Sequence, residues 1–161
     1  MEKFENIYQE NYPEMFRIAK KIVSDGDVAG DIVQEVFVYY FEKMQDGFVV
    51  FHPRSWLVRA VVNKCMDHLN RRKKYAELSA ANELTAEDEN MEIQKQDAIL
   101  KQAIAKLKPL EKKIIVLYSE GYSYKEIAQT AEMNVASVGK TLSRTLLKLK
   151  EILKGLNYEM Y

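Results

Sequence analysis

Apolar residues recur at intervals of three and four positions along most of the chain, the spacing that places them on one face of a helix. This spacing predicts a first helix over residues 4–23 and a second over residues 28–44. A third helix is predicted to begin after Pro53 and to run to the basic cluster that ends at Lys74. Helical spacing returns from about Asp97 onward. Because the alternation typical of strands is almost absent, the predicted fold class is all-α.

The segment between these two helical regions differs in composition. Over residues 75–96 the apolar residues thin out, and glutamate and aspartate cluster. That composition is typical of a linker that is partly helical or disordered. We therefore predict two helical domains, residues 1–74 and residues 97–161, joined by a flexible acidic linker over residues 75–96.

The residues that separate the predicted C-terminal helices fit a helix-turn-helix unit. Gly121 follows an apolar-periodic run, as a helix C-cap does. Ser123 is followed three residues later by Glu126, the spacing of a capping box. A short turn over residues 132–134 then precedes a long last helix. This order of helix, turn and longer helix is typical of proteins that read DNA.

The last helix has two distinct faces. Val135, Val138, Leu142, Leu146, Leu149 and Leu153 form the apolar face. The opposite face holds hydroxyls and cations without a carboxylate, and its members are Ser137, Lys140, Thr141, Arg144 and Lys148. Such a face suits phosphates and base edges. A solvated amphipathic helix is the alternative for a lone helix, but the correctly spaced helix and turn before it favour DNA binding.

Gly139 interrupts the last helix and allows two interpretations. Glycine costs about 1 kcal/mol relative to alanine inside a helix, so a close approach by a neighbouring helix would account for it. Alternatively, residues 139–141 match the end of a nucleotide-binding P-loop. That motif also requires an earlier glycine, a preceding strand and a glycine-rich loop, whereas Asn134 stands at the first position and the flanks are helical. A nucleotide-dependent enzyme is therefore the weaker alternative.

Charge is balanced over the whole chain but not locally. There are 24 Lys and Arg residues and 24 Asp and Glu residues. Between Pro53 and Lys74, however, seven cations stand against the single acid Asp67. Two basic regions thus flank the acidic linker, so the zero net charge does not exclude a nucleic-acid partner.

Cysteine and histidine are scarce. Cys65 is the only cysteine, which excludes a disulfide within the chain and favours a reducing, cytoplasmic environment. His52 and His68 form no recognisable metal-ligand spacing with it, so we expect neither a metal site nor a cofactor. The N-terminal residues lack a hydrophobic signal core, and apolar runs such as residues 48–51 are too short to span a bilayer. We expect no membrane insertion.

Both domains together resemble the extracytoplasmic-function class of bacterial sigma factors, the promoter-recognition subunits of RNA polymerase. The resemblance extends over residues 4–74 and 97–154. The matching segments are DIVQEVFVYYFEK at 31–43, PRSWLVRAVVNKCMDHLNRRKK at 53–74, LKPLEKKIIVLYSEGYSYKEIA at 107–128 and NVASVGKTLSR at 134–144. A helix-turn-helix is shared by many regulators, whereas this ordered pair of regions is specific.

The resemblance implies a polymerase-binding segment in the second predicted helix. The residues carried over are Asp31, Gln34, Glu35 and Phe37. Phe37 also belongs to the apolar stripe, so a role in the core is an equal alternative for it. Three polar groups have no place in a helical core, which favours the other three as interface residues.

The segment from Gln45 to Arg72 resembles the part that opens DNA and reads the −10 element. Aromatic rings there can stack on unpaired bases while cations hold phosphates. The stacking candidates are Phe48, Phe51 and Trp56, and the polar candidates are Arg54, Arg59, Asn63, Arg71 and Arg72. For Trp56, a structural role as a core anchor is the favoured alternative.

The last helix resembles the reader of the −35 element, but residues 139–141 depart from the common family pattern. The family usually has a basic residue at the position of Gly139, a small hydroxyl at that of Lys140 and an arginine at that of Thr141. The preferred −35 sequence is therefore not inherited from relatives.

The resemblance implies an alternative sigma factor without catalytic activity of its own. Its expected partners are core RNA polymerase, promoter DNA and an anti-sigma factor. The main alternative is a helix-turn-helix regulator that binds duplex DNA without being a polymerase subunit. The basic, aromatic segment from Phe48 to Lys74 argues against that alternative, since a sensor domain has no need of such a composition.

Overall fold

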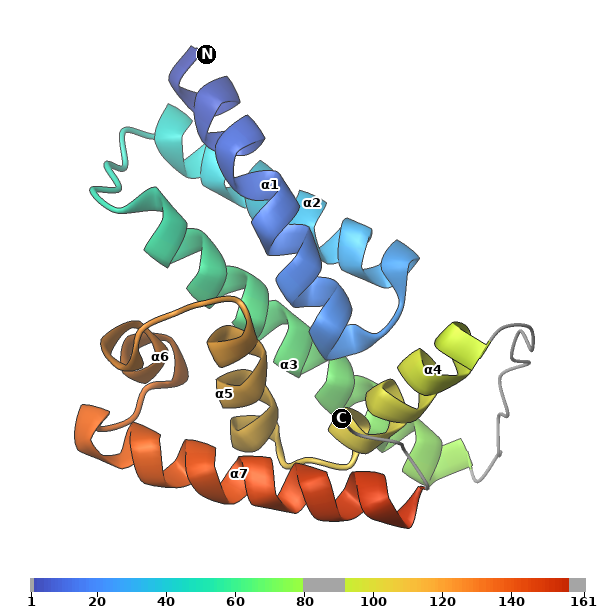
Figure 1. Cartoon of the computed structure of the whole chain (residues 1–161). Helices are drawn as coiled ribbons and strands as arrows, with labels where there is room; N and C mark the ends of the chain where they lie inside the picture. The colour runs from blue at the N-terminus through green and yellow to red at the C-terminus, as the bar shows by residue number, and fades with distance from the viewer. Residues whose placement is uncertain (1, 80–91, 157–161) are drawn as a thin grey trace.

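A computed structural model describes residues 2–79 and 92–156 of the chain. The described residues form helices joined by turns, without a strand, and the predicted all-α class is confirmed (Figure 1). The helices are α1 (Glu2–Val23), α2 (Gly26–Gln45), α3 (Pro53–Ser79), α4 (Glu92–Ala105), α5 (Pro109–Ser119), α6 (Tyr124–Ala131) and α7 (Val135–Gly155). In these residues, no helix is both long enough and apolar enough to cross a membrane.

Helices α1, α2 and α3 pack into the N-terminal bundle. Its core consists of fully buried apolar side chains from all three helices, among them Met15, Ile18, Val33, Phe37, Tyr40, Leu57 and Val61. The turn between α1 and α2 is short because Asp25 caps α2, accepting hydrogen bonds from the backbone N–H groups of Asp27 and Val28. The first two helices were thus predicted at nearly the bounds that the structure has.

The third helix is longer than its sequence pattern predicted. It continues past the basic cluster to Ser79, and Tyr75 and Leu78 are exposed on this extension. Residues 92–96 are also helical, because α4 begins at Glu92. Both ends of the predicted linker are therefore helical, and residues 80–91, its remainder, lie outside the described residues.

The helices after the linker contain the predicted helix-turn-helix. Gly121 has a φ of +86° at the end of α5, a conformation that favours glycine. The Ser123 hydroxyl accepts from the Glu126 N–H at 3.1 Å, and the Glu126 carboxylate accepts from the Ser123 N–H at 2.9 Å. Asn134 caps α7 through a 2.9 Å bond from the Ala136 N–H. The capping box and the turn are confirmed as the sequence predicted them.

The apolar face of α7 is only partly buried. Val138, Leu142 and Leu153 lie in the core. Val135 and Leu146, assigned to the same face by periodicity, keep 48% and 43% of their surface exposed. Val135 lies in the first turn of α7, at the end of the helix, and Leu146 lines an open groove between α7 and α1.

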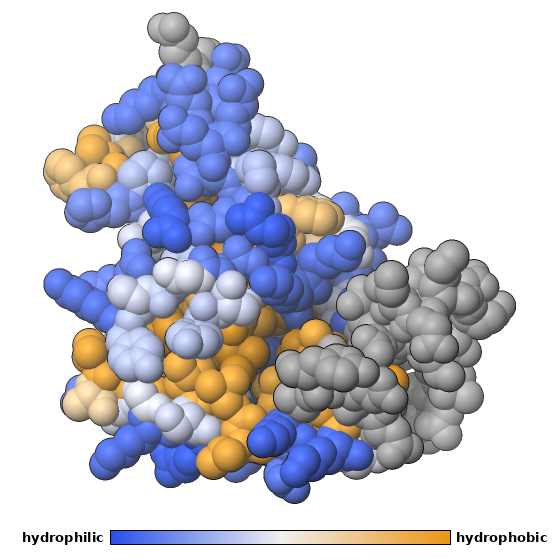
Figure 2. Space-filling model, viewed as in Figure 1, coloured by the Kyte–Doolittle hydropathy of each residue, from blue (hydrophilic) through white to orange (hydrophobic). Residues whose placement is uncertain are grey.

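The C-terminal helices (α4–α7) pack directly against the N-terminal bundle. Helix α5 contacts α1, and α6 contacts α3, as Figure 1 shows. The space-filling view shows apolar residues gathered over the lower half of the molecule, in the C-terminal helices (Figure 2). The sequence analysis expected the two parts to be joined only by a linker, but in the structure they share an interface.

Candidate nucleic-acid and polymerase interfaces

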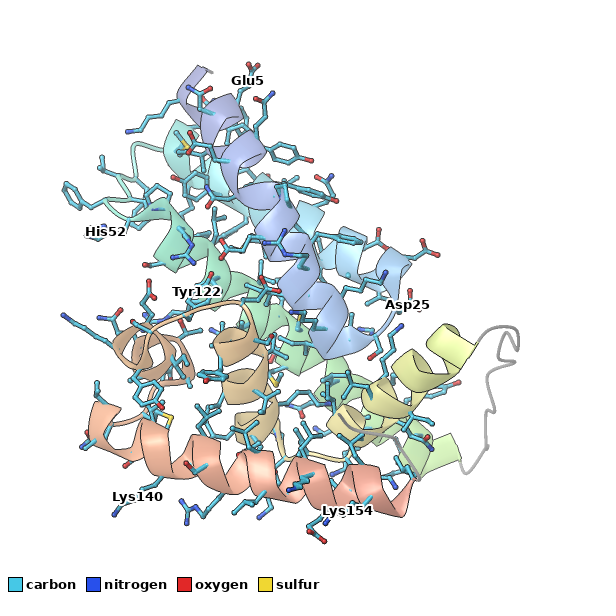
Figure 3. All side chains as sticks on the ribbon, in the orientation of Figure 1. Glu5, Asp25, His52, Tyr122, Lys140 and Lys154 are labelled. Atoms are coloured by element: carbon cyan, nitrogen blue, oxygen red, sulfur yellow. The ribbon has the colours of Figure 1, made fainter. Side chains whose placement is uncertain are left out.

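Helix α7 presents its predicted polar face to solvent. Ser137, Lys140 and Arg144 are exposed, and Thr141 is half-buried. Figure 3 shows Lys140 pointing away from the other helices, at the outer edge of the molecule. The helix N-terminus, at Val135, lies on the same exposed end and adds backbone N–H groups that favour anions. The arrangement offers hydroxyls, cations and a helix dipole to a negatively charged groove.

Lys148, the last predicted member of this face, is engaged within the protein. Its Nζ donates to Glu111 Oε1 at 2.9 Å, which joins α7 to the start of α5. Burial of the Glu111 carboxyl opposes its ionisation, but the Lys108 N–H and Lys148 outweigh that effect and lower its pKa. Contact between Lys148 and a phosphate therefore competes with an existing ion pair.

Residues 139–141 lie inside α7, in continuous helix. A P-loop requires these residues to follow a glycine-rich loop after a strand. The prediction that residues 139–141 end a P-loop is therefore wrong. In the part of the chain that the structure describes, no group of three or more His, Cys, Asp or Glu side chains is placed to hold a metal ion.

The connection between α2 and α3 exposes aromatic side chains. Phe51 keeps 86% of its surface exposed, and Phe48 is also exposed with Lys43 Nζ 5.1 Å from its ring centroid. Figure 2 shows this connection as a separate apolar patch at the left of the molecule. Free aromatic surface beside cations is the combination that binds unpaired bases.

Trp56 is held by neighbouring rings. It stacks on Tyr39 at 6.1 Å between centroids with an interplanar angle of 12°, and it lies 5.3 Å from Tyr40. It is half-buried. The indole thus fixes the start of α3 against α2, as the structural alternative for Trp56 predicted.

Two of the predicted DNA-binding arginines contact the C-terminal helices. Arg54 makes a forked pair with Glu14 of α1, at 2.8 and 3.0 Å, and its third nitrogen lies 3.3 Å from Glu126 of α6. Its guanidinium carbon is 4.3 Å from the centroid of the Tyr122 ring. Arg59 donates to the Gln129 backbone carbonyl at 2.6 Å. Both arginines lie at the junction between the two parts, where Figure 3 labels Tyr122.

This cluster shifts the titration of its members. Hydrogen bonds to Glu14 raise the pKa of Arg54, so its charge is permanent. Burial alone would raise the pKa of Glu14, yet the bonds and charge of Arg54 lower it below its ordinary value of 4.5. Burial, followed by the nearby Glu14 charge, raises the pKa of Tyr122. Glu14 and Tyr122 have no sequence signal that would have marked them, because their partner Arg54 is distant in sequence.

The remaining polar candidates on α3 are exposed. Asn63, Arg71 and Arg72 all face solvent. Asn63 lies near the middle of α3, and Arg71 and Arg72 lie in its C-terminal half. Their polar groups are accessible to a ligand in this conformation.

The polar residues of α2 form an exposed acidic surface. Asp31, Gln34 and Glu35 face solvent; Gln34 donates to the Tyr8 hydroxyl at 3.0 Å, and Glu35 pairs with Lys64 at 3.2 Å. Val38 and Tyr39 are exposed beside them, an apolar contribution that the sequence analysis missed.

Phe37 does not share this surface. Only 1% of it is exposed, and its ring packs against Tyr8 at 4.8 Å and Phe4 at 6.4 Å. Its side chain therefore belongs to the core, and the prediction of a direct polymerase contact is corrected. Helical periodicity places residue 37 with Val33 and Tyr40 on the inward face of α2.

Comparisons with known proteins find matches in both helical parts of the chain. The family model for sigma-70 region 2 matches residues 7–75, and that for sigma-70, region 4 matches residues 97–149. The ECF RNA polymerase sigma factor SigE of Mycolicibacterium smegmatis is 26% identical over 164 aligned residues, which include 95% of this chain. This chain spans 62% of the length of that relative.

Solved structures share the fold. The sigma factor RpoE of Bartonella quintana, in complex with the anti-sigma factor NepR, superposes with a TM-score of 0.71 at 22% identity, covering 96% of this chain and 98% of that one. CnrH in complex with the cytosolic domain of CnrY gives a TM-score of 0.68 at 23% identity, covering 94% of this chain and 88% of that one. The two sigma-70 regions, which occur in the family's order and together match more than half of the chain, place this chain in the sigma-70 family.

Proposed function

We propose that this chain is an alternative sigma subunit that binds core RNA polymerase, directs it to promoters and assists strand opening. The chain matches both sigma regions, and it combines an acidic surface, an exposed aromatic connection and a helix-turn-helix. This combination is the observation that carries the proposal. The polymerase performs the chemistry, so this subunit contributes binding alone. Its place of action is the cytoplasm.

The polymerase contacts the exposed surface of α2. Asp31, Gln34 and Glu35 supply negative charge and hydrogen-bonding groups, and the neighbouring Val38 and Tyr39 supply exposed apolar area. A partner of this surface carries basic and apolar side chains. Charge complementarity of this kind speeds association and fixes the orientation of the complex.

The −10 element binds over the start of α3. Phe48 and Phe51 stack on unpaired bases, while Asn63, Arg71 and Arg72 contact the backbone and base edges farther along the helix. Arg54 and Arg59 join these contacts only after they leave their partners in the C-terminal helices.

The −35 element is read by α7 in the major groove. Ser137, Lys140, Thr141 and Arg144 contact the bases and phosphates, and Lys148 adds a phosphate contact when it exchanges Glu111 for DNA. We place the domain boundaries as the sequence indicated, with residues 1–74 for polymerase and −10 contacts, 75–96 as linker and 97–161 for −35 recognition.

A protein inhibitor is the third partner of this proposal. The sigma factor RpoE of Bartonella quintana forms a complex with an anti-sigma factor, NepR. In this chain an apolar groove of about 750 Å³ lies between α1, α4, α5 and α7. Its lining includes the apolar residues Phe16, Ile104 and Leu146 and the cations Lys20 and Lys101. A helix with an apolar stripe and acidic edges fits that chemistry.

Binding to core polymerase tests the proposal. Purified core polymerase, mixed with the labelled chain, should give a complex that elutes as one species from a sizing column. Replacing Asp31 and Glu35 by arginine should abolish co-elution, because the acidic surface then repels a basic partner. The charge-matched control, Glu10→Arg with Glu151→Arg, alters exposed acids on α1 and α7 and should co-elute normally. A chain that binds specific duplexes but never binds polymerase would be the alternative regulator instead.

A further inference from the structure

The groove between α1, α4, α5 and α7 is lined by apolar side chains at two depths. Ile115 and Val116 of α5 are buried, with 7% and 1% of their surface exposed. Phe16, Ile104 and Leu149 line the groove from α1, α4 and α7 and are half-buried. Its volume of about 750 Å³ lies within the range of small-molecule sites, roughly 300–1,000 Å³. The groove is therefore large enough to hold a small apolar body.

Every charged residue in the described lining of this groove is a cation. These residues, the rim cations, are Arg17, Lys20 and Lys21 of α1 and Lys101 of α4. All four are exposed, so their charged ends lie at the solvent edge while the apolar residues lie deeper. In Figure 2 hydrophilic residues border the apolar surface of the C-terminal helices. A ligand in the groove thus meets hydrocarbon along its body and positive charge at one edge.

The rim keeps an excess of positive charge after its internal ion pairs are counted. Glu120 lies 2.6 Å from Lys21 Nζ and 3.3 Å from Arg17 Nε. One carboxylate offsets the charge of only one of these two cations. Among the described residues, no carboxylate makes an ion pair with Lys20. The rim cations therefore favour a ligand with a negative group over a neutral or cationic one.

We propose that this groove binds a free long-chain carboxylate, a single-chain anionic amphiphile such as dodecanoate. Its hydrocarbon chain lies along Ile115 and Val116, and its carboxylate pairs with Lys20 and Lys101 at the edge. The groove is enclosed by four helices, which suits one chain that enters by itself rather than the surface of a bilayer. Burial of the chain supplies most of the affinity, and the rim cations select the head group.

Binding of the carboxylate does not depend on the sigma function, but its consequence does. The inhibitor helix of the proposed function has an apolar stripe and acidic edges, so it would use the same groove and the same rim cations. The ligand and the helix then exclude each other. Resting on the function proposed above, the site would let a free carboxylate release the chain from its inhibitor, because binding shifts the population toward the inhibitor-free form.

Isothermal titration calorimetry of the full chain tests the proposal, with each ligand kept below the concentration at which it forms micelles. Dodecanoate should bind at one site. Decanoate should bind more weakly, since each methylene that is buried raises the affinity by about fourfold. Dodecyltrimethylammonium carries the same hydrocarbon chain with a positive head group, and it should bind about tenfold more weakly than dodecanoate because the rim cations repel it.

A charge-reversal variant locates the site. Lys20→Glu with Lys101→Glu should lower the affinity for dodecanoate by about tenfold. The control, Lys125→Glu with Lys150→Glu, makes the same change in net charge at exposed lysines outside the groove lining and should bind dodecanoate as the parent does. Leu146→Gln removes apolar lining at a position that is 43% exposed, so it should weaken binding without altering its dependence on salt. Circular dichroism checks that each variant keeps its helices.

Three results would overturn the proposal. The first is equal affinity for dodecanoate and dodecyltrimethylammonium, and the second is equal affinity of the charge-reversal variant and its control for dodecanoate. The third is a chain that gives no heat with dodecanoate but sediments with vesicles of phosphatidylglycerol through Lys20 and Lys101, which would make the groove a membrane contact. If dodecanoate binds as expected while the chain never binds core polymerase, the ligand site stands and the sigma function fails. Polymerase binding without any binding of dodecanoate would refute the ligand site alone.

Discussion

Replacing Gly139 by alanine should stabilise the protein. The glycine is half-buried within α7, and a Cβ built on it would lie 3.5 Å from Cε2 of Tyr124 in α6, an ordinary van der Waals distance. The sequence analysis suggested that a neighbouring helix approaches closely at Gly139, but this distance leaves room for the methyl group of an alanine there. Alanine is favoured over glycine by about 0.8–1.0 kcal/mol in a helix interior. In a chain of this size, about 1 kcal/mol corresponds to a rise in Tm of about 2–4 °C.

Urea and thermal unfolding, followed by circular dichroism at about 222 nm, would measure the effect. Ser143→Gly, on an exposed position one turn later in α7, is the matched control and should lose roughly 0.5 kcal/mol through propensity alone. A Gly139→Ala protein that is less stable than the parent would refute the reasoning, since it would mean that Tyr124 and α7 lack room for the methyl. If stability rises while affinity for −35 DNA falls, the glycine serves the DNA contact.

Three further predictions concern local features. Ser123→Ala should lower the free energy of unfolding by about 1 kcal/mol in urea titrations, because α6 loses its N-cap, and Ser123→Asp should restore it; an alanine variant as stable as the parent would contradict the capping role. Glu14 and Glu126 have folded-state pKa values below 4.5, so the stability they contribute is complete above that pH and is lost as the pH falls through the lowered values. Urea midpoints measured from about pH 7 to about pH 3 should therefore decline, and a midpoint that increases on acidification would reverse the assigned sign. Burial raises the pKa of the Cys65 thiol to about 12, so a disulfide reagent at about pH 8 should modify it far more slowly in native protein than in urea; equal rates would show that the thiol is accessible.

Local signals in the sequence predicted most of the fold. The helix caps and turns depend on hydrogen bonds or backbone angles within a few residues, as at Asn134, Ser123 and Gly121. Their effect can therefore be predicted from the sequence without a structure. Helical periodicity predicted where the helices lie, but it did not predict how deeply each apolar side chain is buried. Phe37 and Leu146 both belong to apolar stripes, yet one is buried and the other lines a groove, because burial depends on which helix packs above each position.

The contact between the N-terminal bundle and the C-terminal helices could not be predicted from the sequence. Arg54 and Arg59 were predicted as DNA ligands from their place in a basic segment, and nothing nearby marks Glu126 or Gln129 as their partners. The chain positions that meet are about 70 residues apart. Long-range pairing of this kind follows from how α5 and α6 dock on the bundle, which no local pattern encodes.

The central claim is that this chain confers promoter specificity on RNA polymerase, and run-off transcription tests it most directly. Core polymerase is incubated with fragmented genomic DNA of the host, with and without the purified chain, and the transcripts are mapped. New discrete transcripts with defined starts, dependent on the chain and lost on Asp31→Arg with Glu35→Arg, are the predicted result. Identical transcripts with and without a chain that binds specific duplexes by itself would contradict the claim and favour a conventional regulator.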